Sequence, residues 1–182
     1  METPISNDEI CSLLVTHTVQ VFSMMLDLCV SPRSTAIQQN LDGGGGGIIA
    51  LVGFAGMWKG TGSVSCGSEL ACQLTSKMLM AEFPSVDEQV LDVIGEITNM
   101  IIGNFKTSAE SLLGPLGMST PTVLHGSDFH ARTLNGQLWT SVTFECEGKM
   151  LEVRVSLAPS PQGKNAPHTP VRSQYCTRPL NQ

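Results

Sequence analysis

The chain has 182 residues, of which 41% are hydrophobic and 14% are charged, and such values are typical of a soluble domain with a sizeable core. Its formal net charge is −6, and all 16 acidic residues lie at or before Glu152. An acidic domain of this kind argues against nucleic-acid binding, because phosphate backbones are bound by Lys and Arg.

The cysteines and the apolar segments bear on the compartment. The six cysteines, at positions 11, 29, 66, 72, 146 and 176, include no CxxC pair and no neighbouring His at zinc-ligand spacing, so we expect free thiols in a reducing cytosol. The segment METPISNDEI lacks the basic region of a signal peptide. Polar residues interrupt Ile10–Val30, the stretch that comes nearest to a membrane span. We therefore expect a cytoplasmic protein that does not bind a membrane.

The first predicted element is a helix that Ser6 or Asn7 caps and that continues to about Leu28, where helical apolar spacing ends. Residues 31–47 are predicted to form a loop that ends in five glycines, Gly43–Gly47. A phosphate-binding P-loop would need Gly-Lys-[Ser/Thr] and a following helix, whereas a strand pattern follows here. The glycines therefore indicate a flexible loop, and a small-ligand site on them is kept as an alternative function.

A hairpin and two helices come next. Residues 48–56 and 58–66 alternate as two strands of a hairpin, and Ser68 is a candidate cap for a short helix. Ser85 and Glu88 have the spacing of a capping box, which predicts a long helix from about residue 86 to beyond 105. Gly114-Pro115 ends the helical pattern. Four methionines, Met24, Met25, Met78 and Met80, are predicted to lie in the core.

Further strands complete the domain. Residues 121–125 predict a strand, and residues 138–146 and 150–157 predict a second hairpin. The remainder is rich in Pro, Gln and Asn and poor in large apolar residues, so we expect a domain over residues 1–157 and a disordered tail over 158–182.

A weak repeat relates the two hairpins. Phe54 and Lys59 in the first hairpin correspond to Phe144 and Lys149 in the second, and each hairpin follows a long amphipathic helix. The fold class is therefore predicted to be α+β: an antiparallel or mixed sheet with long helices packed on one face, built from two helix-plus-hairpin halves.

The long helix carries the polar pattern that suggests chemistry. At about 100° per residue, Glu96 lies about 40° to one side of Asp92 and Asn99 about 20° to the other, and Gly103 lies between them. The opposite stripe is apolar and is predicted to pack on the sheet; it consists of Val90, Val93, Ile94, Ile97 and Ile101. An isolated Glu and Asn on a helix are usually only solvated surface, but here Gly103 would also let a partner approach closely.

The run GEITNMIIGN resembles the signature of the CheC/CheX/FliY phosphatases. In that pattern an Asp or Ser, a Glu and an Asn are followed by a Pro about 22 residues after the Asn. This chain has Asp92, Glu96, Asn99 and Pro121, with 21 residues between Asn99 and Pro121. The first helix has no second Glu-x2-Asn, so the chain resembles the single-site CheX type. That resemblance implies a phosphatase that acts on the phosphoaspartate of a CheY-like response-regulator receiver, and a homodimer.

The two polar side chains suit different parts of this reaction. A carboxamide can accept a hydrogen bond from water and donate one without adding negative charge beside a phosphoryl group, so Asn99 is the candidate for orienting the attacking water. The resemblance implies that Glu96 pairs with the receiver's active-site Lys. The receiver would supply a divalent metal, expected to be Mg²⁺, so we expect this chain to need no cofactor or metal of its own. The alternative is a non-catalytic receiver-binding or scaffold module of the flagellar-switch type.

Overall fold

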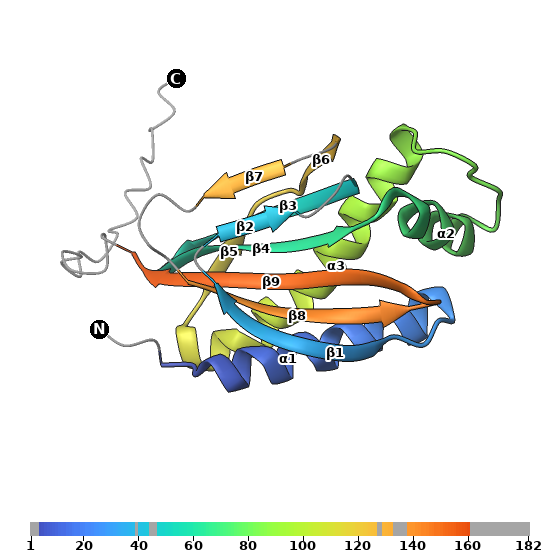
Figure 1. Ribbon diagram of the computed structural model, residues 1–182. Helices are drawn as coiled ribbons and strands as arrows, with labels where there is room; N and C mark the ends of the chain where they lie inside the picture. Colours follow the sequence, from blue (N-terminus) through green and yellow to red (C-terminus); the bar gives the residue numbers. More distant parts are fainter. Residues whose placement is uncertain (1–3, 39, 44–46, 127–128, 133–137, 161–182) are drawn as a thin grey trace, which may run out of the picture.

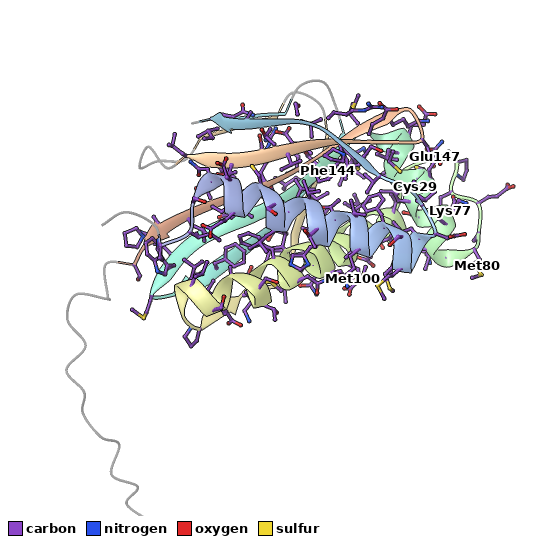
Figure 2. All side chains as sticks on the ribbon, turned by 90° about the horizontal axis from the view of Figure 1, so that it is seen from below. Cys29, Lys77, Met80, Met100, Phe144 and Glu147 are labelled. Atoms are coloured by element: carbon purple, nitrogen blue, oxygen red, sulfur yellow. The ribbon has the colours of Figure 1, made fainter. Side chains whose placement is uncertain are left out.

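The computed structural model describes residues 4–38, 40–43, 47–126, 129–132 and 138–160, with side chains for all of these except 40–43 and 129–132. Its centre is a seven-stranded antiparallel sheet, and helices α1 (Asn7–Val21) and α3 (Glu88–Leu113) lie side by side on one face of it (Figures 1 and 2). Between sheet and helices lies one hydrophobic core, in which Phe22, Phe105 and Phe144 are fully buried. The predicted α+β class is confirmed.

The strands are not arranged in the order of the sequence. The sheet order is β1-β8-β9-β4-β3-β5, with β6 also paired to β3, and β2 pairs with β7 in a separate two-stranded ribbon. The strands are β1 (Ser31–Gln38), β2 (Asn40–Gly43), β3 (Gly47–Gly56), β4 (Trp58–Cys66), β5 (Leu116–Met118), β6 (Thr122–Gly126), β7 (Phe129–Arg132), β8 (Trp139–Cys146) and β9 (Lys149–Pro159).

The predicted two halves are present and exchange strands. The hairpins β3–β4 and β8–β9 meet through the β4–β9 ladder at the centre of the sheet. The leading strand of each half crosses to the other half's hairpin, because β1 pairs with β8 and β6 pairs with β3. Phe54 and Phe144 are both buried at matching places. Since each half completes the sheet of the other, we expect them to fold as one cooperative unit.

Helix α3 begins two residues later than the sequence indicates. Its N-cap is Asp87, whose side chain accepts a hydrogen bond of 2.9 Å from the Val90 backbone N–H, so the predicted Ser85–Glu88 capping box is wrong. Asp87 can take this place because its backbone is extended, with φ −130° and ψ −174°. The helix ends at Gly114, whose φ of +75° favours glycine.

The predicted loop over residues 31–47 is wrong for most of its length. It contains β1 and β2, and β1 pairs with β8 along the edge of the sheet. The side chains of β1 are exposed up to Ile37, so this strand lacks the apolar alternation by which strands are recognised. Pro32 fits an edge strand, where one row of backbone N–H groups needs no partner.

Helix α1 starts as expected and ends in a π-helical turn. Ser6 and Glu9 form a capping box, and the turn over Phe22–Leu26 closes at Asp27 with a φ of 52°. By length and mean hydropathy, 1.4, the segment Asn7–Leu26 could cross a membrane, but a core helix passes the same test. Here α1 packs against α3 and β8.

The short helix α2 (Ser68–Leu79) has Gly67 at its N-cap position, so the expected Ser68 cap is wrong. The methionine prediction is also wrong in three of four cases, since Met24, Met25 and Met80 are 72%, 51% and 95% exposed. The reason is positional: they lie at helix ends, where the chain turns away from the core. Lys77 of α2 and Glu147 lie at one end of the molecule (Figure 2) and line a hollow of about 740 Å³.

Two further predictions concern the end of the domain and the thiols. Strand β9 continues to Pro159, which pairs with Trp58, so the fold extends two residues beyond the predicted boundary at residue 157. The predicted disordered tail lies outside the described residues from residue 161 onward.

The thiols of the described cysteines are free; these are Cys11, Cys29, Cys66, Cys72 and Cys146. Cys176 lies outside the described residues.

Candidate functional site

Helix α3 presents the predicted polar stripe outward. Asp92 and Glu96 are exposed, and Asn99 and Gly103 are partly exposed. The predicted apolar stripe is buried against the sheet, with Ile101 fully buried. The carboxylate of Glu96 and the carboxamide of Asn99 therefore lie about one turn apart on the face of α3 that points away from the core.

Pro121 lies at the edge of this stripe. A Cβ atom placed on Gly95, the residue before Glu96, would be 3.7 Å from Pro121 Cβ and 3.2 Å from Val123 Cγ2. At this point α3 therefore lies close to Pro121, which precedes β6, and to Val123 within β6. Strands β5 and β6 both pair with β3. Ser119 fixes the segment between them to β3, since its hydroxyl accepts a 2.9 Å hydrogen bond from the Gly53 N–H. The 21-residue spacing thus places Pro121 beside the motif.

A hollow of about 490 Å³ opens beside Asn99, between the second half of α3 and β5. Its walls include Met100 and Gly103 from the helix and Leu116 and Met118 from the strand. A Cβ on Gly103 would lie 3.5 Å from Met118 Cε, an ordinary contact distance, so the glycine widens the hollow where helix and strand face each other. In Figure 2, Met100 lies in the helix layer, and it is partly buried against the hydrophobic core.

Lys106 also lines the hollow and belongs to a short polar chain. Its Nζ lies 3.0 Å from Glu110 Oε1, and the same oxygen accepts a 2.9 Å hydrogen bond from the Leu116 N–H. The Leu116 N–H, and next the Lys106 ammonium, hold the pKa of the Glu110 carboxyl below its ordinary value. Glu110 therefore joins the end of α3 to the start of β5.

Glu96 and Asn99 are available to a second molecule. Within the described ranges, neither side chain makes a hydrogen bond or an ion pair, while their neighbour Thr98 is buried and donates to the Ile94 carbonyl. A free carboxylate can bind a cation, and a free carboxamide can hold a water. In the described part of the chain, no group of three or more His, Cys, Asp or Glu side chains could hold a metal ion.

The structure thus brings all five predicted residues, Asp92, Glu96, Asn99, Gly103 and Pro121, to one side of α3. Sequence reasoning missed Lys106 and the β5 wall of the hollow. Lys106 could have been found, because it follows Asn99 by seven residues, or two helical turns. The β5 wall could not, since a three-residue strand carries almost no pattern.

Comparison with solved structures places the fold among CheC-like proteins. A CheC-like superfamily protein from Shewanella matches with a TM-score of 0.74 and 21% identity over 87% of this chain and 99% of that one. The chemotaxis protein CheX from Vibrio vulnificus matches with a TM-score of 0.73 and 22% identity over 82% and 99%. The CheX–CheY–BeF3–Mg²⁺ complex from Borrelia burgdorferi matches with a TM-score of 0.66 and 20% identity over 81% and 97%. At these identities the likeness concerns the fold.

The sequence identifies the family. The chain belongs to the family described as chemotaxis phosphatase CheX, whose profile matches residues 48–145, more than half of its length. It is also 30% identical over 87 residues to the CheY-P phosphatase CheX of Thermotoga maritima. That match covers 47% of this chain and 56% of the relative, so the chain spans little more than half the length of the relative. The resemblance found in GEITNMIIGN is confirmed at the level of the family.

Proposed function

We propose that the protein is a phosphatase that dephosphorylates the phosphoaspartate of a CheY-like response-regulator receiver domain. The observation that carries the proposal is the pair of unengaged side chains, Glu96 and Asn99, on the outward face of α3. Family membership supports the same reaction, since the Thermotoga relative is named a CheY-P phosphatase. The Borrelia relative forms a complex with CheY in the presence of BeF3 and Mg²⁺, which agrees with a receiver as the partner.

In the proposed mechanism Asn99 holds the attacking water. The reaction forms a bond between water oxygen and phosphorus, breaks the bond between phosphorus and the aspartyl oxygen, and releases inorganic phosphate and the free carboxylate. The transition state is loose, so catalysis consists mainly of placing the water in line with the breaking bond. The carboxamide of Asn99 does this without a negative charge that the phosphoryl oxygens would repel.

Glu96 serves docking in this proposal. Its exposed carboxylate would form an ion pair with the receiver's active-site Lys and hold α3 across the phosphorylated pocket. The receiver would supply Mg²⁺, and this chain would need no cofactor of its own. We further propose that the protein acts in the cytoplasm as a homodimer, on the resemblance to the CheX type.

A dephosphorylation screen tests the proposal. Each receiver domain of the source genome is phosphorylated with acetyl phosphate, and its loss of phosphate is followed with and without the purified chain. We expect a shortened lifetime for at least one receiver. Binding to a phosphorylated receiver without any change in its lifetime would instead establish the scaffold alternative, and no effect on any receiver would refute both.

A further inference from the structure

The hollow beside Asn99 lies where a docked partner would extend. It begins at Asn99 and continues along α3 to Lys106, with Leu116 and Met118 opposite. Lys106 follows Asn99 by seven residues, so it lies about 10 Å further along the helix and about 20° around it. A protein that places its phosphoryl group at Asn99 must therefore cover Lys106 or come close to it.

Lys106 is the one cationic side chain on this helix. The sequence of α3 contains four acidic residues and no base other than Lys106, in a chain of net charge −6. Its side chain is only 23% exposed, so most of it is covered where it lines the hollow. A shielded positive charge in a negative surface favours an anionic partner group at this point.

Lys106 retains capacity to bind such a group. An ammonium has three donors, and the only ion pair that Lys106 makes in the described structure is the one with Glu110 Oε1, an oxygen that also accepts from the Leu116 N–H. Glu110 thus positions Lys106 and neutralises it only in part. The absence of a side chain at Gly103 leaves space in front of it.

We propose that the hollow receives an acidic side chain of the same receiver domain, and that Lys106 is a docking residue for it. This inference rests on the proposed function and adds a second anchor to it. Glu96 would bind a cation of the receiver and Lys106 an anion about 15 Å further along the helix. Two anchors of opposite sign fix the direction in which the receiver lies along α3 and reject partners with the reverse pattern.

The experiment compares Lys106→Met with Glu110→Gln in the full chain. Both variants remove the ion pair, but only the first removes the cation, and the Gln oxygen can still accept from the Leu116 N–H. The partner is the receiver whose beryllofluoride complex the wild type binds most tightly, and this complex serves for measuring Kd. Thermal unfolding confirms that both variants are folded.

We expect Lys106→Met to raise Kd and KM about fivefold, as for an ion pair at the rim of an interface, with kcat within about twofold of the wild type. The salt dependence of Kd should become weaker. Glu110→Gln should leave Kd unchanged or lower it, because Lys106 is then free of its internal partner. A receiver whose acidic side chain opposite Lys106 is replaced by a neutral one should bind the wild type and Lys106→Met with the same Kd.

Three results would overturn the inference. Equal increases of Kd in both variants would show that Lys106 only stabilises the connection between α3 and β5. An unchanged Kd in Lys106→Met, or a loss of kcat alone, would show that Lys106 does not bind the receiver. Failure of the proposed function is distinct from these. A wild type that binds the receiver without dephosphorylating it refutes the phosphatase, while Kd still decides the role of Lys106. A wild type that does neither refutes both.

Discussion

At the scale of single residues, the proposed chemistry depends on the difference between a carboxylate and a carboxamide one turn apart. Both side chains are polar, but only the neutral carboxamide of Asn99 can approach a phosphoryl group without electrostatic repulsion. Their helical spacing puts both on one face, and this could be predicted from the sequence because the apolar stripe behind them is complete. The free state of both side chains became visible only with the structure.

Gly103→Ala should separate stability from binding. Alanine in a helix interior is favoured over glycine by about 1 kcal/mol, and its Cβ would meet Met118 Cε at an ordinary 3.5 Å, so thermal unfolding should shift upward or stay constant. The added methyl group narrows the hollow beside Asn99, so the Kd for the phosphorylated receiver should rise. A loss of stability would show that this glycine serves packing inside the protein, and unchanged binding would contradict its role in the hollow.

At the scale of elements, the position of α3 fixes the site, and its ends were harder to predict than its existence. The spacing of Ser85 and Glu88 predicts a cap at Ser85, whereas the structure has the cap at Asp87, where the backbone is extended and the side chain accepts from the Val90 N–H. Likewise β1 could not be recognised, because its side chains are exposed and its stability comes from backbone pairing with β8, a strand more than 100 residues later.

The cap makes a measurable prediction. Asp87→Ala should lower the free energy of unfolding by about 1 kcal/mol, because the Val90 N–H loses its hydrogen-bond acceptor. Ser85→Ala is the matched control and should change it by less than about 0.5 kcal/mol. Urea denaturation measures both. A larger loss at Ser85 than at Asp87 would restore the capping box that the structure contradicts.

The contact between α3 and the sheet can be tested at Gly62 in β4. A Cβ there would lie 2.6 Å from Ile102 Cγ2 and 2.8 Å from its Cδ1, and Ile102 is fully buried, so Gly62→Ala should destabilise the fold by about 1–3 kcal/mol. Gly53→Ala in β3 is the control, since its Cβ would meet only Ser119, at 3.5 Å. Equal stability of the two variants would mean that α3 packs further from the sheet than described.

At the scale of the whole molecule, the β4–β9 ladder makes the sheet continuous, and β1 and β6 each pair with the hairpin of the other half. The two hairpins, the long helices and the antiparallel class were predictable from periodicity and turn residues. The exchanged pairing and the extra edge strands were not, because long-range register leaves no local signal in a single sequence. The end of the domain was missed for a related reason. The last residues of β9, up to Pro159, have no apolar pattern of their own and are strand because they pair with β4.

Truncation tests where the domain ends. A chain ending after residue 157 loses the pairing of Ala158 with Lys59 and of Pro159 with Trp58, so its melting temperature should fall by a few degrees. A chain ending after residue 160 keeps both pairs and should melt within about one degree of the full chain. A large loss in the longer truncation would refute the expectation that the remaining tail is disordered.

The most direct test of the proposed function is the rate at which Asn99→Ala dephosphorylates its receiver. Single-turnover loss of phosphate should slow on the order of 10²-fold, because the water is no longer held in line, while Kd for the beryllofluoride complex stays within a few-fold. Gln20→Ala, which removes an exposed carboxamide from α1, should react at the wild-type rate. A folded Asn99→Ala protein with wild-type activity would contradict the assignment of Asn99 and the mechanism built on it.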